Sequence, residues 1–222
     1  MDELVPVFES SLFEQPIEVG SEFLEIGIDS VLKDGLLKDI PIVGTILGAG
    51  KFAQNLYDRN LIRQTVAFIN EFNRGELDDE KLQKYRRKLA RNPKFSEEEL
   101  GRVLILLNKT IDTKKSKLLA RFYRAYTHEK ISWDVFCELC DITDRLFLAD
   151  LENLEEAYRN HGVNENMSIS YRHDRLISTG LLTNEARLSG GVIIGNLDSD
   201  TPTTIMTLTQ IGDIFCRYAF NR

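Results

Sequence analysis

The most reactive side chains of this chain are those of three cysteines, and two of them stand close together. Cys137 and Cys140 form a CxxC pair, whereas Cys216 is remote from both. A structural zinc site takes four ligands, commonly from two such pairs. In a redox-active CxxC motif, the cysteines lie at the start of a helix beside a βαβ unit. Here the spacing of the apolar residues predicts that Cys137 and Cys140 lie inside a helix. We therefore predict that Cys137 and Cys140 are small buried hydrophobic residues without a metal.

Two other segments imitate ligand-binding loops but depart from the required patterns. Residues 44–51 end in Gly-Lys, as a phosphate-binding loop does, but Thr45 stands at the position of its first glycine and Phe52 at that of its Ser or Thr. Residues 196–207 begin like a calcium-binding loop, but threonine stands at the turn glycine and at the final glutamate. Neither nucleotide binding nor calcium binding is predicted here.

The histidines and possible nucleophiles form no catalytic pattern in the sequence. His128, His161 and His173 have no histidine four residues away. No serine or cysteine is matched to a base by a known motif. We expect a protein that is not an enzyme and that needs neither a cofactor nor a metal.

Composition and hydrophobic periodicity indicate that a helical protein carries these residues. Hydrophobic residues make up 42% and charged residues 28% of the chain, which is typical of globular proteins rather than disordered, fibrous or membrane-spanning ones. One helix is predicted to begin with a capping box of Ser96 and Glu99. Ile111 and Phe147 are expected to be buried near the ends of two helices. Apolar residues recur at helical spacing in the segments 20–34, 51–73, 79–92, 96–111, 113–126, 132–147 and 151–158.

The pattern changes after Gly162, where a small module with strands is predicted. Residues 172–182 have the pattern of a short helix, and residues 190–195 and 203–208 that of two strands joined as a hairpin. Thr209 is then the expected cap of a last helix.

This module carries a resemblance to known families. The segments Arg175 to Leu182 and Leu208-Thr209-Gln210-Ile211-Gly212 are similar to the ending of many bacterial winged-helix proteins. With Phe215-Cys216 after the glycine, the segment also resembles the Abi-alpha-like family of bacterial proteins linked to abortive infection. The resemblance covers about residues 172–220 and implies a winged-helix-like fold and a role in antiviral defence.

We therefore expect a mainly α fold, a helical bundle with a small C-terminal winged-helix-like module that contains a β-hairpin. Three parts are expected along the chain. Residues 1–50 form an acidic arm with a glycine-bearing apolar segment, residues 51–162 form the bundle, and residues 163–222 form the module.

Charge is divided unevenly along the chain, whose formal net charge is −7. Residues 1–50, 51–130 and 131–222 carry about −8, +8 and −7. Either these segments pair with one another, within the chain or between subunits, or the basic middle segment binds an anionic partner. A basic surface is predicted on one side of a helix, formed by Lys114, Lys117, Arg121 and Arg124.

A second candidate for interaction is an apolar segment in which Gly44 and Gly48 form a G-x-x-x-G motif. Small residues four apart let two helices approach closely, in water or in lipid. Together with Ile42 and Leu47, these glycines form either a tight helix contact in the core or a segment that lies on, or inserts into, a membrane.

Two hypotheses about function follow. In the first, the chain is a non-enzymatic interaction or effector protein of abortive-infection type, acting through self-association, a protein partner or an anionic membrane surface. In the alternative, it is a winged-helix regulator that binds DNA through Arg172, Arg175 and Arg187. The acidic C-terminal segment favours the first, because DNA binding needs a basic face, and nucleic acid is not an expected partner. Without a secretory signal or a disulfide framework, we expect a cytoplasmic protein, peripheral to a membrane if the glycine segment acts there.

Overall fold

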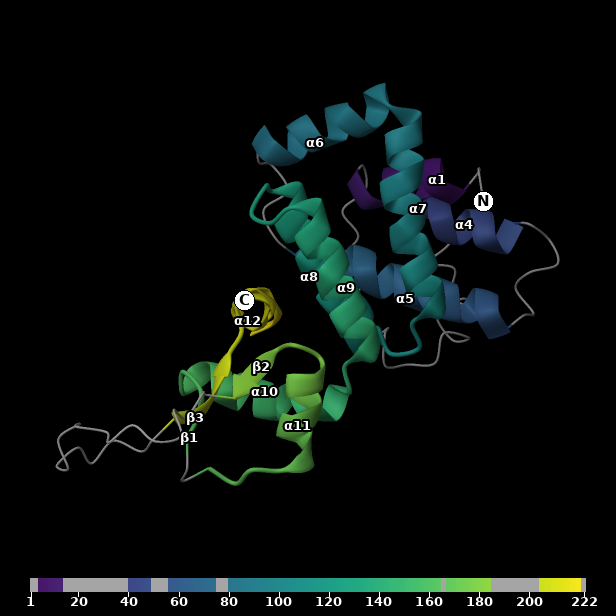
Figure 1. The fold of residues 1–222 in the computed structure, drawn as a ribbon. Helices are drawn as coiled ribbons and strands as arrows, with labels where there is room; N and C mark the ends of the chain where they lie inside the picture. Colours follow the sequence, from purple (N-terminus) through teal and green to yellow (C-terminus); the bar gives the residue numbers. More distant parts are fainter. Residues whose placement is uncertain are drawn as a thin grey trace, which may run out of the picture. The chain divides into compact units, whose positions relative to one another are not determined.

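A computed structural model describes residues 4–13, 40–48, 56–74, 80–164, 167–184 and 204–220 (Figure 1). Packing divides the chain into two compact units, which we call the N-terminal unit, residues 1–136, and the C-terminal unit, residues 137–222. The division lies inside helix α9 (Trp133–Arg145), whereas the sequence suggested a boundary near residue 162.

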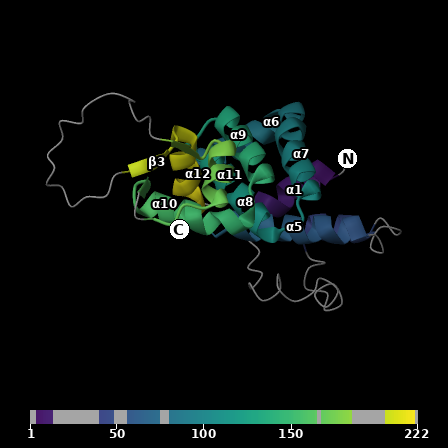
Figure 2. The ribbon, with the colours of Figure 1, turned by 60° about the horizontal axis from the view of Figure 1, so that its bottom comes forward.

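Helices make up the described part of the N-terminal unit. Their bounds are α1 (Leu4–Phe13), α4 (Pro41–Gly48), α5 (Leu56–Phe72), α6 (Glu80–Arg91), α7 (Pro93–Lys109) and α8 (Thr113–Thr127), followed by the start of α9. The helices α5 and α8 lie side by side (Figures 1 and 2). Buried Gln64 of α5 accepts a hydrogen bond from Ser116 Oγ of α8 at 2.8 Å and donates one to the Ile111 carbonyl at 2.7 Å. These bonds compensate the burial of a polar side chain in the contact.

Aromatic rings connect the helices of this unit. Phe8 of α1 contacts Phe68 of α5, and Phe68 contacts Tyr123 of α8, with ring centroids 5.9 Å apart in both pairs. Tyr123 in turn lies 5.4 Å from Phe136 of α9. All four side chains are fully buried. Such pairs add about 0.5–1.5 kcal/mol each to the free energy from burial, so this row stabilises the packing of α1, α5, α8 and the start of α9.

The start of α7 differs from the prediction. Asn92 is the N-cap, accepting a hydrogen bond from a first-turn amide at 3.2 Å, and Pro93 is the first helical residue. Proline suits that position because an N–H there would have no partner within the helix. Ser96 therefore lies inside the helix, and the predicted capping box with Glu99 is wrong. Ser96 Oγ instead donates to Glu9 Oε2 of α1 at 2.8 Å.

Two side chains that were predicted to be buried are exposed. The exposed fraction is 79% for Ile111 and 57% for Phe147. Because α7 ends at Lys109 and α9 at Arg145, both residues follow the last helical turn. Helical spacing no longer sets the direction of a side chain there.

The C-terminal unit combines short helices with a small sheet. After α9 its elements are the 3-10 turn η1 (Leu148–Asp150), α10 (Leu151–Arg159), β1 (Val163–Asn164), α11 (Tyr171–Ser178), β2 (Leu182–Asn184), β3 (Thr204–Leu208) and α12 (Gln210–Phe220). The strands are antiparallel in the order β1-β3-β2, with Leu182 opposite Leu208. A mainly helical chain with a small sheet near its C-terminal end confirms the predicted fold class. The predicted strand at 190–195 lies outside the described residues.

Thr209 and Gly212 fix the start of α12. Thr209 Oγ accepts a hydrogen bond from the Gly212 amide at 2.9 Å and donates one to the Gly180 carbonyl at 2.5 Å, while the Thr209 amide donates to the Leu181 carbonyl at 3.1 Å. A Cβ atom on Gly212 would lie 2.0 Å from the Leu181 carbonyl oxygen. The Leu-Thr-x-x-Gly sequence therefore combines a helix cap with a close approach of two backbones.

Candidate functional site

Helix α6 carries a dense row of basic residues. Of its 12 residues, six are lysine or arginine and one is glutamate. Its buried residues are Leu82, Tyr85 and Leu89, which follow the i, i+3, i+7 spacing of one helix face. This spacing leaves most of the basic side chains around the solvent side of the helix.

The surface beside this row is hollowed. A cavity of about 540 Å³, which we call the α6 hollow, is lined on one side by Lys81, Lys84, Arg87, Lys88 and Arg91. The end of α8 and the following turn line it as well, through Tyr126, Thr127 and Glu129. Pockets for small ligands are typically about 300–1,000 Å³, so the volume is sufficient for a ligand. Cationic side chains around a concave surface favour an anionic one.

A hydrogen-bonded network joins the walls of the hollow. Glu99 of α7 accepts hydrogen bonds from the Tyr85 and Tyr126 hydroxyl groups, both at 2.6 Å, and the Tyr85 and Tyr123 hydroxyl oxygens are 2.7 Å apart. Burial raises the pKa of Glu99, whereas the hydrogen bonds from Tyr126 and Tyr85 lower it. Burial also raises the pKa of Tyr85 above its usual range, so its phenol stays protonated. The network therefore positions α6 on α7 and α8 rather than supplying an ionised tyrosine.

Glu129 faces the basic row from a strained backbone position. Its φ of 54° lies in the left-handed region, which costs an L-residue about 1–2 kcal/mol. The Glu129 amide donates to the Tyr126 carbonyl and the Lys130 amide to the Ala125 carbonyl, both at 2.9 Å, a helix ending that usually has glycine at this position. The Glu129 carboxylate accepts a hydrogen bond from Lys84 Nζ at 2.8 Å. This bond, more than any other effect, raises the pKa of Lys84.

Two other basic residues of the hollow have defined local contacts. Lys88 Nζ lies 3.6 Å from the centroid of the Phe95 ring, a cation–π contact. Arg87 Nε donates to the Gln83 carbonyl at 3.3 Å. Both Arg87 and Lys88 are exposed, so their charges are accessible to a ligand from solvent.

The basic surface predicted on α8 is only partly a surface. Lys114 is exposed and Lys117 half-buried. Arg121 Nε donates to Glu71 Oε1 at 2.6 Å, with its side chain 16% exposed. Arg124 is half-buried, and this burial lowers its pKa while Glu71 acts in the opposite direction. The second half of the predicted stripe is therefore directed towards α5.

The glycine segment forms α4 and packs on α1. Ile42 is fully buried, and its amide donates to Ser11 Oγ at 3.0 Å. Leu47 and Gly44 are half-buried, whereas Gly48 is exposed and an added Cβ there would meet no atom within 4 Å. The predicted tight contact at Gly48 is therefore wrong for the described part of the chain. Among the described residues, no helix combines the length and hydropathy needed to cross a membrane. A role at a partner or a membrane surface stays a prediction.

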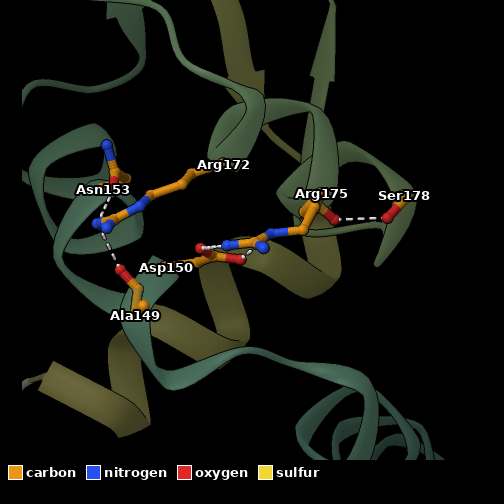
Figure 3. Close-up of polar contacts among 6 residues, drawn as sticks. All are labelled: Ala149, Asp150, Asn153, Arg172, Arg175 and Ser178. Atoms are coloured by element: carbon orange, nitrogen blue, oxygen red, sulfur yellow. Dashed lines mark hydrogen bonds and ion pairs between the residues drawn. The ribbon is translucent and has the colours of Figure 1, made fainter.

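The arginines of α11 that were candidates for binding DNA make contacts within the C-terminal unit (Figure 3). Arg175 binds both carboxylate oxygens of buried Asp150, with Nε at 2.9 Å from Oδ2. Its guanidinium carbon also lies 4.3 Å and 4.9 Å from the ring centroids of Phe147 and Tyr171. Arg172 Nη1 donates to the Ala149 carbonyl at 2.9 Å. Both arginines thus anchor α11 on η1, directly before α10, and Arg187 lies outside the described residues.

The cysteines only partly match the prediction, because Cys140 is buried as expected but Cys137 is not fully buried. Cys140 and Cys216 are buried and Cys137 is half-buried. Burial, with smaller contributions from Asp213 and Glu155, raises the pKa of Cys216 to about 12. Within the described ranges, no three His, Cys, Asp or Glu side chains gather in a way that could hold a metal ion.

Comparison of the chain with protein-family models, with curated proteins and with solved structures found no match. The α6 hollow was not predicted from the sequence, although the charge of the middle segment pointed to it. Six basic residues between 81 and 91 with apolar residues at helical spacing were the available signal. The contribution of Glu129 and Tyr126 depends on packing between α6 and α8, which no local pattern encodes.

Proposed function

We propose that this chain is a non-enzymatic binding protein of effector type, which engages an anionic partner through the α6 hollow. The observation that carries the proposal is the row of basic side chains from Lys81 to Arg91 around a concave surface. In a chain with a formal net charge of −7, such a concentration of cations provides a local field that attracts anions. The resemblance of residues 172–220 leads us to propose abortive infection as the setting.

Several features support binding rather than chemistry at this site. The tyrosines next to the hollow donate hydrogen bonds to buried Glu99, so the network acts as a rigid wall. Apart from Glu129, the charged groups that line the hollow are lysine and arginine, which bind anions through direct hydrogen bonds and long-range attraction.

The alternative of a DNA-binding regulator has less support. Arg175 is bonded to Asp150 and Arg172 to the Ala149 carbonyl, so neither is held open for a phosphate. The segment 131–222 carries about −7, which repels a polyanion. A DNA contact through α11 would first have to break these bonds.

The test is a binding comparison with three anionic probes at a low salt concentration of about 50 mM. The probes are a fluorescein-labelled acidic peptide, a labelled DNA duplex of about 20 base pairs, and vesicles that contain phosphatidylserine. The variant Arg87→Gln/Arg91→Gln removes two charges from the hollow. The matched control, Arg102→Gln/Lys109→Gln, removes two exposed charges from α7 outside it.

We expect at least one probe to bind the wild type, with the affinity lowered about five- to tenfold in the hollow variant and less than twofold in the control. If no probe binds, or if both variants lower the affinity equally, the hollow is not the binding site.

A further inference from the structure

Glu129 is the feature of the hollow that its proposed function does not explain. Among the described residues that line the hollow, it is the one with a carboxylate. It takes a left-handed conformation that glycine or asparagine would adopt at lower cost. A residue of this charge at this position thus weakens both the helix ending and the positive field of the hollow.

The carboxylate of Glu129 is itself an anion held by a cation of the basic row. It lies 2.8 Å from Lys84 Nζ, the distance of a charge-assisted hydrogen bond. Both side chains are largely exposed, at 51% for Glu129 and 69% for Lys84. Exposed ion pairs of this kind contribute little to stability, so a carboxylate from another molecule can take the place of Glu129.

The basic row also has dimensions that suit an extended polypeptide. Lys81 and Arg91 are ten residues apart on one helix, so they are about 15 Å apart along its axis. An extended chain advances about 3.3 Å per residue and directs alternate side chains to one side, about 6.6 Å apart. About five residues would span the row, with acidic side chains at alternate positions near successive cations.

We propose that the α6 hollow binds an acidic segment of a partner protein, and that Glu129 is an internal competitor that this segment displaces from Lys84. The inference rests on the proposed function and adds to it the chemistry of the ligand and a device that sets its affinity. Charge complementarity favours this ligand, because the hollow already holds one carboxylate in hydrogen-bonding geometry. The flat surface of a bilayer would not fit into the concave hollow.

The inference is tested with a fluorescein-labelled peptide of about eight residues that alternates Glu with Ser, and with a control peptide that alternates Gln with Ser. Fluorescence anisotropy gives the dissociation constant for the wild type and for Glu129→Gln. The matched variant Glu97→Gln removes the same charge from an exposed position of α7 in the same unit, outside the hollow. Circular dichroism checks that each variant is folded.

We expect Glu129→Gln to bind the acidic peptide about two- to fivefold more tightly than the wild type, the range of one exposed ion pair. Glu97→Gln should change the dissociation constant less than 1.5-fold, about the effect of net charge alone. The Gln–Ser peptide should not bind measurably. Equal effects of the two glutamate variants would overturn the role of Glu129.

Other outcomes separate this inference from the proposed function. If DNA or phosphatidylserine vesicles bind through Arg87 and Arg91 while the acidic peptide does not, the proposed function stands and the ligand assignment is wrong. If light scattering shows that the chain self-associates, and Arg87→Gln/Arg91→Gln abolishes it, the occupant is a second copy and the assignment to a different protein is wrong. If no probe binds at all, both proposals fail.

Discussion

Replacing Gly212 with alanine should destabilise the C-terminal unit. The added Cβ would lie 2.0 Å from the Leu181 carbonyl oxygen and 3.0 Å from its carbonyl carbon, both backbone atoms. Because a backbone cannot move aside as the end of a side chain can, α12 must withdraw by more than about 1 Å to reach van der Waals contact. That shift would lengthen the hydrogen bond from the Thr209 amide to Leu181, now 3.1 Å, and the bond from Thr209 Oγ to Gly180.

The magnitude follows from two opposing contributions. Forcing an extra carbon into a packed site costs about 1–3 kcal/mol, and the backbone contact suggests the upper end of that range. In the opposite direction, the higher helix propensity of alanine stabilises a helix by about 1 kcal/mol relative to glycine. A net loss of about 2 kcal/mol in the free energy of unfolding is expected, which for a unit of this size lowers the melting temperature by about 10 °C.

The assay is thermal and urea unfolding followed by circular dichroism, with Gly101→Ala as the matched control. Gly101 is also inside a helix, but a Cβ there would meet only Val5 Cγ2, at the ordinary contact distance of 3.8 Å. Gly101→Ala should therefore raise the stability by about 0.5–1 kcal/mol. If Gly212→Ala is as stable as the wild type or more stable, the close approach of α12 to Leu181 does not exist in solution.

Three further predictions concern residues discussed above. Cys140→Ala should lower the free energy of unfolding by about 1–2 kcal/mol through lost packing, and metal analysis of the purified protein should find no stoichiometric zinc. Because burial raises the pKa of Glu99, ionisation of this carboxyl group opposes folding. The free energy of unfolding of the wild type should therefore increase relative to that of Glu99→Gln as the pH falls from about 7 to about 5. A difference between the two proteins in urea unfolding that does not change with pH would refute this. Gly48→Leu should change stability by less than about 0.5 kcal/mol in a thermal melt, because the space around Gly48 is open; a larger loss would reveal a neighbour at that position.

The parts of the fold that were predictable from the sequence depend on local signals. The helices α8 and α9 begin at Thr113 and Trp133, close to the starts predicted at residues 113 and 132, because Asp112 and Ser132 accept hydrogen bonds from amides two or three residues away. The same rule failed at Ser96, where a serine and a glutamate have the spacing of a capping box. There the side chains bond to other helices, and the Asn-Pro pair that ends α6, as the sequence suggested, also starts α7.

The candidate site was harder to predict because it is made by tertiary contacts. The basic residues of α6 are evident in the sequence, but the wall opposite them is the last turn of α8, about 40 positions later in the chain. The predicted stripe on α8 had the right charge, yet Arg121 lies against Glu71, which no pattern within α8 reveals. The strands β1 and β2 escaped prediction because each has only two or three residues, too few for an alternation to be recognised.

The order of the strands has a consequence for the synthesis of the protein. The central strand, β3, is the last of the described strands in the sequence, so β1 and β2 leave the ribosome before the strand that joins them exists. Until residue 208 emerges, β1 and β2 lack the strand to which they are hydrogen-bonded. The Leu181 carbonyl likewise lacks its hydrogen-bond donor, the Thr209 amide. The pairing of α5 with α8 can form much earlier. The nascent chain should therefore acquire protection from proteases first in its N-terminal unit and later in its C-terminal unit.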